Sequence, residues 1–301
     1  MRSDSTVGRL LGRVVVPLAV LLAAACNSKT AQTPTGPTPP PTPGQPVSYA
    51  AVGASDAIGV GASVPCIPFS PCPDGTGYVQ TIARQLGANN TPVTLTNLGI
   101  PAAVIGPDIQ AIGVQYGRTI PGNFLDQEMP FVPRNSTVVT IFAGGNDTNT
   151  IAAAIGGGAG GSDPLGYLNA QIKAFGNDYS ALVSGIRDRA PSARIVIANL
   201  PNVAGMPFTA GYALDRRQLV QKISVGFTTQ AINGFASQGI PVVDLMCDPR
   251  FQSASIYSSD GFHPNDAGYA ALAELMLRAI TSTSYPAPQA SCPQMTVVPP
   301  I

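Results

Sequence analysis

Short apolar runs alternate with longer stretches of helical periodicity along most of this chain. The runs that read as strands are 48–52, 93–97, 136–142, 194–199 and 241–245. Two of them, around 138–142 and 195–198, are apolar almost throughout, which is typical of parallel strands covered on both faces. The alternation therefore predicts an α/β fold with a five-stranded parallel sheet wrapped by helices.

Four stretches between and after these runs have the periodicity of helices: 77–86, 165–189, 215–238 and 265–281. The last repeats Tyr269, Leu272, Met276 and Ile280 at helical spacing, which places them on one face. Asn265 precedes it as a suitable helix cap. The glycine-rich segment 156–162 predicts a flexible loop, either at the rim of a groove or as a plain surface linker.

The start of the chain does not fit this alternation. Arg2, Arg9 and Arg13 precede an apolar run over 14–25, which is shorter than the roughly 20 residues that cross a membrane. The run ends in Leu-Ala-Ala-Ala before Cys26 and resembles a bacterial lipobox. This resemblance implies a lipoprotein signal peptide over 1–25 and a diacylated Cys26. An ordinary signal peptide that happens to precede a cysteine stays open as the alternative.

Residues 26–47 are dominated by proline and threonine and lack the apolar residues that a packed structure needs. We expect an extended tether here, followed by one domain over 48–301. With the acylated cysteine, this layout predicts an exported, membrane-anchored lipoprotein in the periplasm or at the cell surface.

The overall composition narrows the class of protein. With 45% hydrophobic residues in 301, the chain can build one sizeable core. Its 16 basic residues balance 16 acidic ones, and no basic patch favours a nucleic-acid partner.

Once Cys26 is assigned to lipid, four cysteines remain, as expected for two disulfides in an exported protein. We favour a local bridge between Cys66 and Cys72 and a second between Cys247 and Cys292, although the other two pairings stay open. The four lack the spacing of a structural zinc site, so we expect no metal.

Reactive residues follow the predicted strands, where the crevice of an open parallel sheet lies. Ser55 comes just after the first strand. A serine hydroxyl needs a positioned base, and His263 is the only histidine in the chain. Asp260 precedes it by three residues, so its carboxylate can accept the Nδ1 hydrogen and leave Nε2 free to face a serine.

Charge that develops on a substrate oxygen also needs fixed donors. Gly99 follows the second strand, and its backbone amide allows close approach. Asn146 follows the third strand and offers a neutral side-chain amide. Both positions suit an oxyanion hole, with the amide of Ser55 as a third donor.

The four segments that carry these residues resemble the blocks of the SGNH (GDSL-like) hydrolase superfamily, in order. They read V-G-A-S-D at Ser55, N-L-G at Gly99, G-G-N-D at Asn146 and D-G-F-H at His263. The resemblance implies a flavodoxin-like three-layer α/β/α sandwich and ester hydrolysis by a Ser55–His263–Asp260 triad. It also implies Gly99 and Asn146 as oxyanion donors. Ala54 departs from the pattern, because the family has an Asp there that braces the nucleophile loop.

These features predict a serine esterase or lipase that works through an acyl-Ser55 intermediate without metal or organic cofactor. Its substrate is an acylated glycan, a short-chain ester or a lipid, and the sequence does not choose among them. The alternative is a non-catalytic surface protein that keeps the fold for binding or adhesion, an interpretation motivated by Ala54.

Overall fold

The computed structural model describes residues 38–301, so the predicted signal peptide and Cys26 lie outside the described residues. Residues 38–46 contain turns but no helix or strand. The sheet that follows is parallel throughout, with the strand order β2-β1-β3-β4-β5. Its strands are β1 (Val47–Gly53), β2 (Val93–Asn97), β3 (Val138–Phe142), β4 (Arg194–Ala198) and β5 (Val242–Val243). The predicted five-stranded parallel sheet is confirmed.

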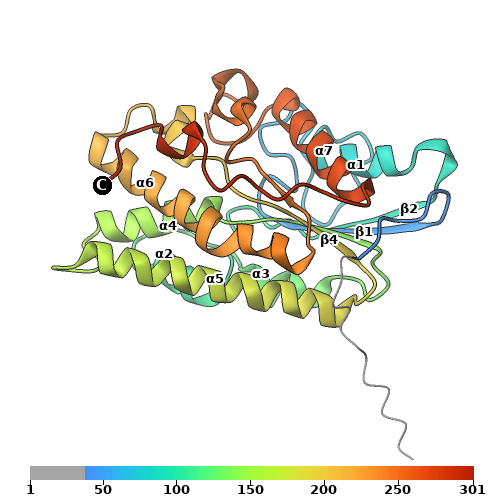
Figure 1. Cartoon of the computed structure of the whole chain (residues 1–301), viewed down its shortest axis with the longest axis horizontal. Coiled ribbons are helices and arrows are strands. Elements are labelled where there is room, and N and C mark those ends of the chain that lie inside the picture. Colours follow the sequence, from blue (N-terminus) through green and yellow to red (C-terminus); the bar gives the residue numbers. More distant parts are fainter. Residues whose placement is uncertain (1–37) are drawn as a thin grey trace, which may run out of the picture. The chain divides into compact units, whose positions relative to one another are not determined.

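Helices cover both faces of this sheet, and Figure 1 shows α1 and α7 on one side and α4, α5 and α6 on the other. The helices are α1 (Tyr78–Leu86), α2 (Pro107–Gln115), α3 (Phe124–Gln127), α4 (Gly145–Gly156), α5 (Pro164–Arg189), α6 (Leu214–Gly226) and α7 (Asp266–Thr281). The three-layer arrangement agrees with the predicted fold class. Three of the helices, α2, α3 and α4, were not predicted.

The stretch predicted as one helix over 215–238 is regular only as far as Gly226. It continues as a wide π turn over Phe227–Ile232 and as 3₁₀ turns over Asn233–Gln238. Phe227 stacks on Phe175 of α5 with ring centroids 3.7 Å apart. This tight contact accompanies the change of helix type, since packing against a neighbouring element can override local periodicity.

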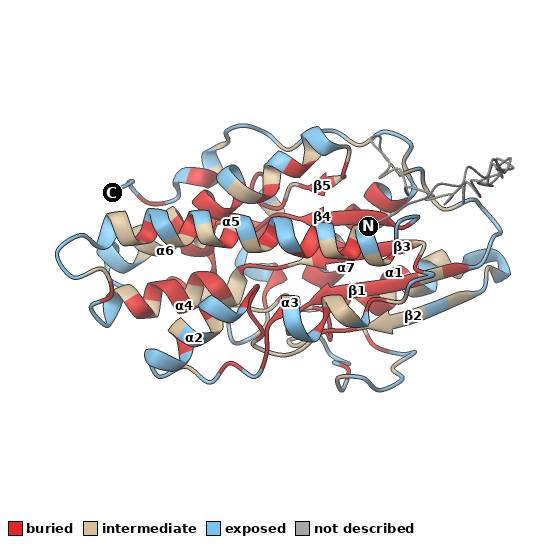
Figure 2. Ribbon diagram, turned by 90° about the horizontal axis from the view of Figure 1, so that it is seen from below, coloured by how far each residue is buried: buried red, intermediate tan, exposed pale blue. Residues whose placement is uncertain are grey.

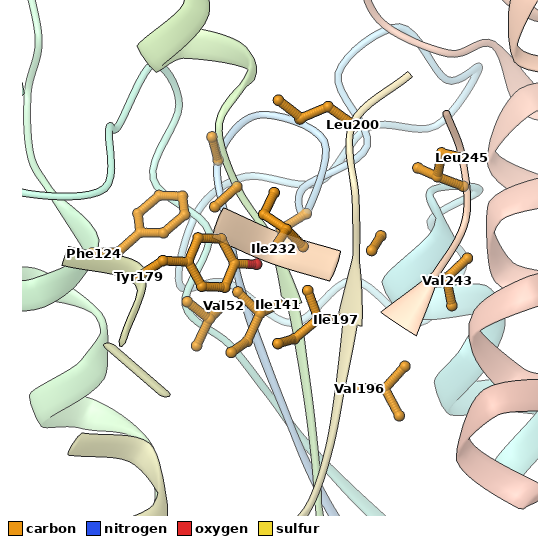
Figure 3. Close-up of a cluster of buried hydrophobic side chains, with 14 of the residues drawn as sticks. Val52, Phe124, Ile141, Tyr179, Val196, Ile197, Leu200, Ile232, Val243 and Leu245 are labelled. Atoms are coloured by element: carbon orange, nitrogen blue, oxygen red, sulfur yellow. The ribbon is translucent and has the colours of Figure 1, made fainter. Parts of the chain in front are cut away.

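The core lies between the sheet and the helices. Val52, Ile141 and Ile197 occupy matching positions on β1, β3 and β4, and Figure 3 shows them side by side. All three are fully buried. Figure 2 shows β1, β3 and β4 buried along most of their length, whereas the edge strand β2 is only partly covered. The apolar runs of the sequence therefore mark the central strands.

Two disulfides are present with the pairing that we favoured. Cys66–Cys72 closes a short loop after β1, and Cys247–Cys292 joins the segment after β5 to the C-terminal tail. Such bridges are typical of exported proteins. None of the helices within residues 38–301 has the length and hydrophobicity that a membrane crossing requires.

Candidate active site

Ser55 lies in the turn that follows β1, at the edge of the sheet where parallel strands end. The turn is closed by backbone hydrogen bonds from Ala57 N–H to Ala54 O (3.1 Å) and from Val60 N–H to Ser55 O (3.0 Å). Only 6% of Ser55 is exposed. The hydroxyl is thus held on a short hydrogen-bonded turn at the end of β1.

Asp260 and His263 share one loop directly before α7. Oδ2 of Asp260 lies 2.6 Å from Nδ1 of His263. Oδ1 accepts three further hydrogen bonds: from the hydroxyl of Ser258 (2.9 Å) and from the backbone amides of Phe262 (2.8 Å) and His263 (2.9 Å). The turn itself therefore fixes the carboxylate against the imidazole.

The fold brings this pair to Ser55 from a distant part of the chain. His263 Nε2 lies 2.8 Å from Ser55 Oγ, although the two residues are 208 positions apart. Phe262 packs edge-on against the imidazole, with ring centroids 5.0 Å apart. The three residues predicted as a triad thus form a continuous hydrogen-bonded chain, in the order nucleophile, base and orienting carboxylate.

The electrostatics of Asp260 favour its charged form. Burial raises the pKa of this carboxyl, but hydrogen bonds from the His263 side chain, the two backbone amides and Ser258 outweigh it and lower the pKa to about 2. Asp260 is therefore ionised at neutral pH and can stabilise an imidazolium beside it.

Gly99 lies just beyond β2 and packs tightly against the Ser55 turn. A Cβ at this position would come within 2.8 Å of Ala57 Cβ and 3.0 Å of Ala54 O, so only glycine fits. Its N–H donates to Oδ1 of Asn97 at 3.1 Å. The amide thus lies beside the nucleophile turn, as expected, but already has a partner that a substrate oxygen would have to share or displace.

Asn146 is the second residue of α4, which begins directly after β3. Its Nδ2 donates to Ala103 O at 3.0 Å, on the loop that follows Gly99. A side-chain amide carries two N–H groups. This contact uses one of them to orient Asn146, and the second can donate to a substrate oxygen. Gly144 makes the turn possible, because its φ of +117° is a conformation that residues with a Cβ rarely adopt.

A mainly apolar pocket adjoins these residues. Its lining includes Ala54, Asn146, Leu200, Met206 and Phe262. Such a lining suits the hydrocarbon part of an ester, with the polar groups of the site at its edge.

Two carboxyl groups near the site are fully buried, those of Glu128 and Asp147. Neither of them was assigned a role from the sequence. Asp147 Oδ1 accepts the N–H of Ile105 at 2.8 Å, so two consecutive residues of α4 hold the loop that follows Gly99. Glu128 Oε2 accepts the N–H of Gly53 at 2.9 Å. Asp147 was visible next to Asn146 in the sequence, but nothing local distinguishes Glu128 from a surface residue.

Side chains that could bind a metal ion do not cluster in the described part of the chain. Within residues 38–301, no three His, Cys, Asp or Glu side chains are arranged to hold a metal ion.

The known proteins that this chain resembles are lipases and acylhydrolases. The model of the GDSL-like Lipase/Acylhydrolase family matches residues 51–271. No curated protein matches the chain significantly in sequence. Among solved structures, the chain resembles the lipase Lip_vut3 from a goat rumen metagenome, with a TM-score of 0.54, 21% identity, and coverage of 77% of this chain and 97% of that one.

Two Streptomyces enzymes are similar to a comparable degree. The extracellular lipase of Streptomyces rimosus has a TM-score of 0.54 at 19% identity and covers 79% of this chain and 100% of its own. Phospholipase A1 of Streptomyces albidoflavus NA297 has a TM-score of 0.51 at 18% identity, with coverage of 79% and 100%. At these identities the structural similarity shows a shared fold.

Proposed function

The chain belongs to the GDSL-like Lipase/Acylhydrolase family, and on this basis we propose that it is a serine esterase that cleaves carboxylic esters through an acyl-Ser55 intermediate. The observation that carries the proposal is the hydrogen-bonded chain from Ser55 through His263 to Asp260, at 2.8 and 2.6 Å.

In the first step, Ser55 Oγ attacks the ester carbonyl carbon and its proton passes to His263 Nε2. Asp260 stays ionised and stabilises the imidazolium through Nδ1. The carbonyl oxygen becomes an oxyanion, for which Asn146 Nδ2 and the backbone amides of Gly99 and Ser55 are the proposed donors. The alcohol leaves with the proton from His263, and the acyl group remains on Ser55.

In the second step, a water molecule gives a proton to His263 Nε2 and attacks the acyl carbonyl. Collapse of this second tetrahedral species returns the proton to Ser55 Oγ and releases the carboxylic acid. The mainly apolar pocket bordered by Leu200 and Met206 is the proposed site of the acyl group. Acylated glycans, short-chain esters and lipids all supply such a group.

The same contacts weigh against the alternative of a binding or adhesion protein. Such a protein has no need for a histidine that lies 2.8 Å from a buried serine and is held by a carboxylate that itself accepts four hydrogen bonds. The Ala54 substitution, which motivated that alternative, leaves all three triad residues in contact.

We further propose that the protein is exported and anchored through a lipid on Cys26. The two disulfides support export, because such bridges persist in oxidising compartments. Mature protein should partition into detergent, and Cys26→Ser should abolish this partitioning. An unmodified Cys26 in the mass spectrum of the mature protein would refute the anchor.

The test of the activity is hydrolysis of nitrophenyl esters from acetate to palmitate by the purified full-length protein, with Ser55→Ala as the control. We expect turnover that the control lacks, and labelling by a fluorophosphonate at Ser55 alone. The preferred chain length then narrows the substrate class. Absence of both turnover and labelling would favour the binding protein.

A further inference from the structure

The chain has two glutamates, and their surroundings are opposite. The side chain of Glu274 is 65% exposed and pairs with Arg250. Glu128, which follows α3, is fully buried. Burying a carboxyl group costs free energy of folding unless hydrogen bonds compensate for the loss of water. The hydrogen-bond partners of Glu128 therefore indicate what it does in the fold.

Glu128 makes its hydrogen bond with the last residue of β1. Its Oε2 accepts the N–H of Gly53 at 2.9 Å, two residues before Ser55. The amide of Ile100, one residue after Gly99, also lies near this carboxyl. Burial raises the pKa of Glu128 well above its usual range, and the amides of Gly53 and Ile100 offset this only in part.

Strand geometry explains why Gly53 needs this partner. The N–H and C=O of one residue in a strand point to the same side, and the carbonyl of Gly53 accepts the N–H of Ile100 on the β2 side. Pairing between β1 and β2 ends at Ala51 and Asn97. The N–H of Gly53 therefore points to where β2 has turned away, and a buried N–H without an acceptor would be costly.

Glu128 also lies where two parts of the site meet. Gly53 lies two residues before Ser55. Its carbonyl oxygen accepts the N–H of Ile100 at 3.3 Å, and Ile100 directly follows Gly99. Ala54, the residue between Gly53 and Ser55, has a side chain that accepts no hydrogen bond. The side-chain acceptor at this junction thus comes from a separate segment of the chain.

From these contacts we infer that Glu128 is a positioning residue, which takes the place of a strand at Gly53 and so holds the Ser55 and Gly99 turns in register for ester hydrolysis. The inference rests on the proposed function for its catalytic consequence, but the anchoring of Gly53 is a separate, measurable property. Displacements of the order of 1 Å at a reacting group can lower turnover about 100-fold, so loss of this anchor should reduce kcat.

Two variants separate acceptance of the hydrogen bond from other roles. Glu128→Gln keeps an oxygen at the same distance, and we expect it to retain the kcat of the native protein. Glu128→Met has similar length without an acceptor, and we expect kcat to fall about 10- to 100-fold while KM stays unchanged. Glu274→Met is the matched control at the exposed glutamate and should change neither value. Loss of kcat in Glu128→Gln as large as in Glu128→Met would overturn the inference.

Hydrogen exchange, measured on peptides that span residues 49–58, tests the hydrogen bond between Gly53 and Glu128 independently of any ester hydrolysis. We expect faster exchange at Gly53 in Glu128→Met and native exchange in Glu128→Gln. If the native protein cleaves no ester while this difference is seen, the proposed function fails and the anchor stands. If Glu128→Met has native exchange and native kcat, the anchor is wrong and the esterase stands.

If Glu128→Met does not fold, Glu128→Asp replaces it, because the shorter side chain keeps the carboxyl but withdraws it from Gly53. The same loss of kcat and faster exchange are then expected. Native kcat in Glu128→Asp would overturn the inference.

Discussion

Replacing Asp260 by asparagine should reverse the proton arrangement of His263. Oδ1 of Asp260 accepts hydrogen bonds from the Ser258 hydroxyl and from the amides of Phe262 and His263 at 2.8–2.9 Å. Because backbone amides only donate, an asparagine must place its amide oxygen there. Its Nδ2 then faces His263 Nδ1 across the contact that measures 2.6 Å to Oδ2 in the native protein.

The wrong tautomer follows from this orientation. Nδ2 of asparagine only donates, so His263 Nδ1 must accept and the ring proton moves to Nε2. A protonated Nε2 cannot take the proton of Ser55, which lies 2.8 Å away. We therefore expect kcat to fall about 10⁴-fold, as for this change in other serine triads, which corresponds to about 5.4 kcal/mol of barrier.

The assay is kcat and KM for a nitrophenyl ester, with thermal unfolding to show that Asp260→Asn is folded. Asp266→Asn is the matched control. Asp266 lies three residues after His263 but accepts its hydrogen bonds from Ser63 and Thr76, so its replacement should leave kcat unchanged. A loss smaller than about tenfold in Asp260→Asn would refute the reasoning.

Three further predictions concern the proposed oxyanion donor Asn146, the buried carboxyl of Asp147 and the disulfide that holds the C-terminal tail. Asn146→Ala should lower kcat about 10²–10³-fold with little change in KM, and a raised KM at native kcat would mean that Asn146 binds the ground state instead. Burial raises the pKa of Asp147 to about 7, so the native state keeps a proton that the unfolded state releases above about pH 4. The free energy of unfolding in urea should therefore fall between about pH 4 and 7, and Asp147→Asn should remove up to about 1.4 kcal/mol per pH unit of that slope; equal slopes would contradict this. Replacing Cys247 and Cys292 by serine should cost about 2–5 kcal/mol of stability, measured by the same unfolding, and an unchanged midpoint would contradict a stabilising bridge.

The sheet could be predicted from the sequence because its central strands are covered on both faces. A run such as Val138–Phe142 is almost wholly buried and is apolar except for Thr140, so consecutive residues of the sequence indicate the strand. The triad residues could be predicted for a similar reason, because Ser55 directly follows a strand and the base and carboxylate share one short segment.

Other features depend on contacts that no local pattern carries. Helix α4 begins within a Gly-Gly segment that reads as a turn, and the N-terminal contacts that fix it reach across to Ala103 and Ile105. The irregular turn after Gly226 accompanies packing on α5. Likewise, Glu128 is an ordinary polar residue in the sequence, and only the tertiary structure shows that its partner is Gly53.

The site joins a local part to a remote one, and this has a consequence for how activity arises during folding. Asp260 and His263 are three residues apart, whereas Ser55 and His263 are separated by 208. Loop closure of that length is slow compared with formation of a single turn. A partly folded chain can therefore hold an oriented imidazole and still be inert toward esters. Recovery of hydrolysis after denaturation would report the arrival of β1 between β2 and β3.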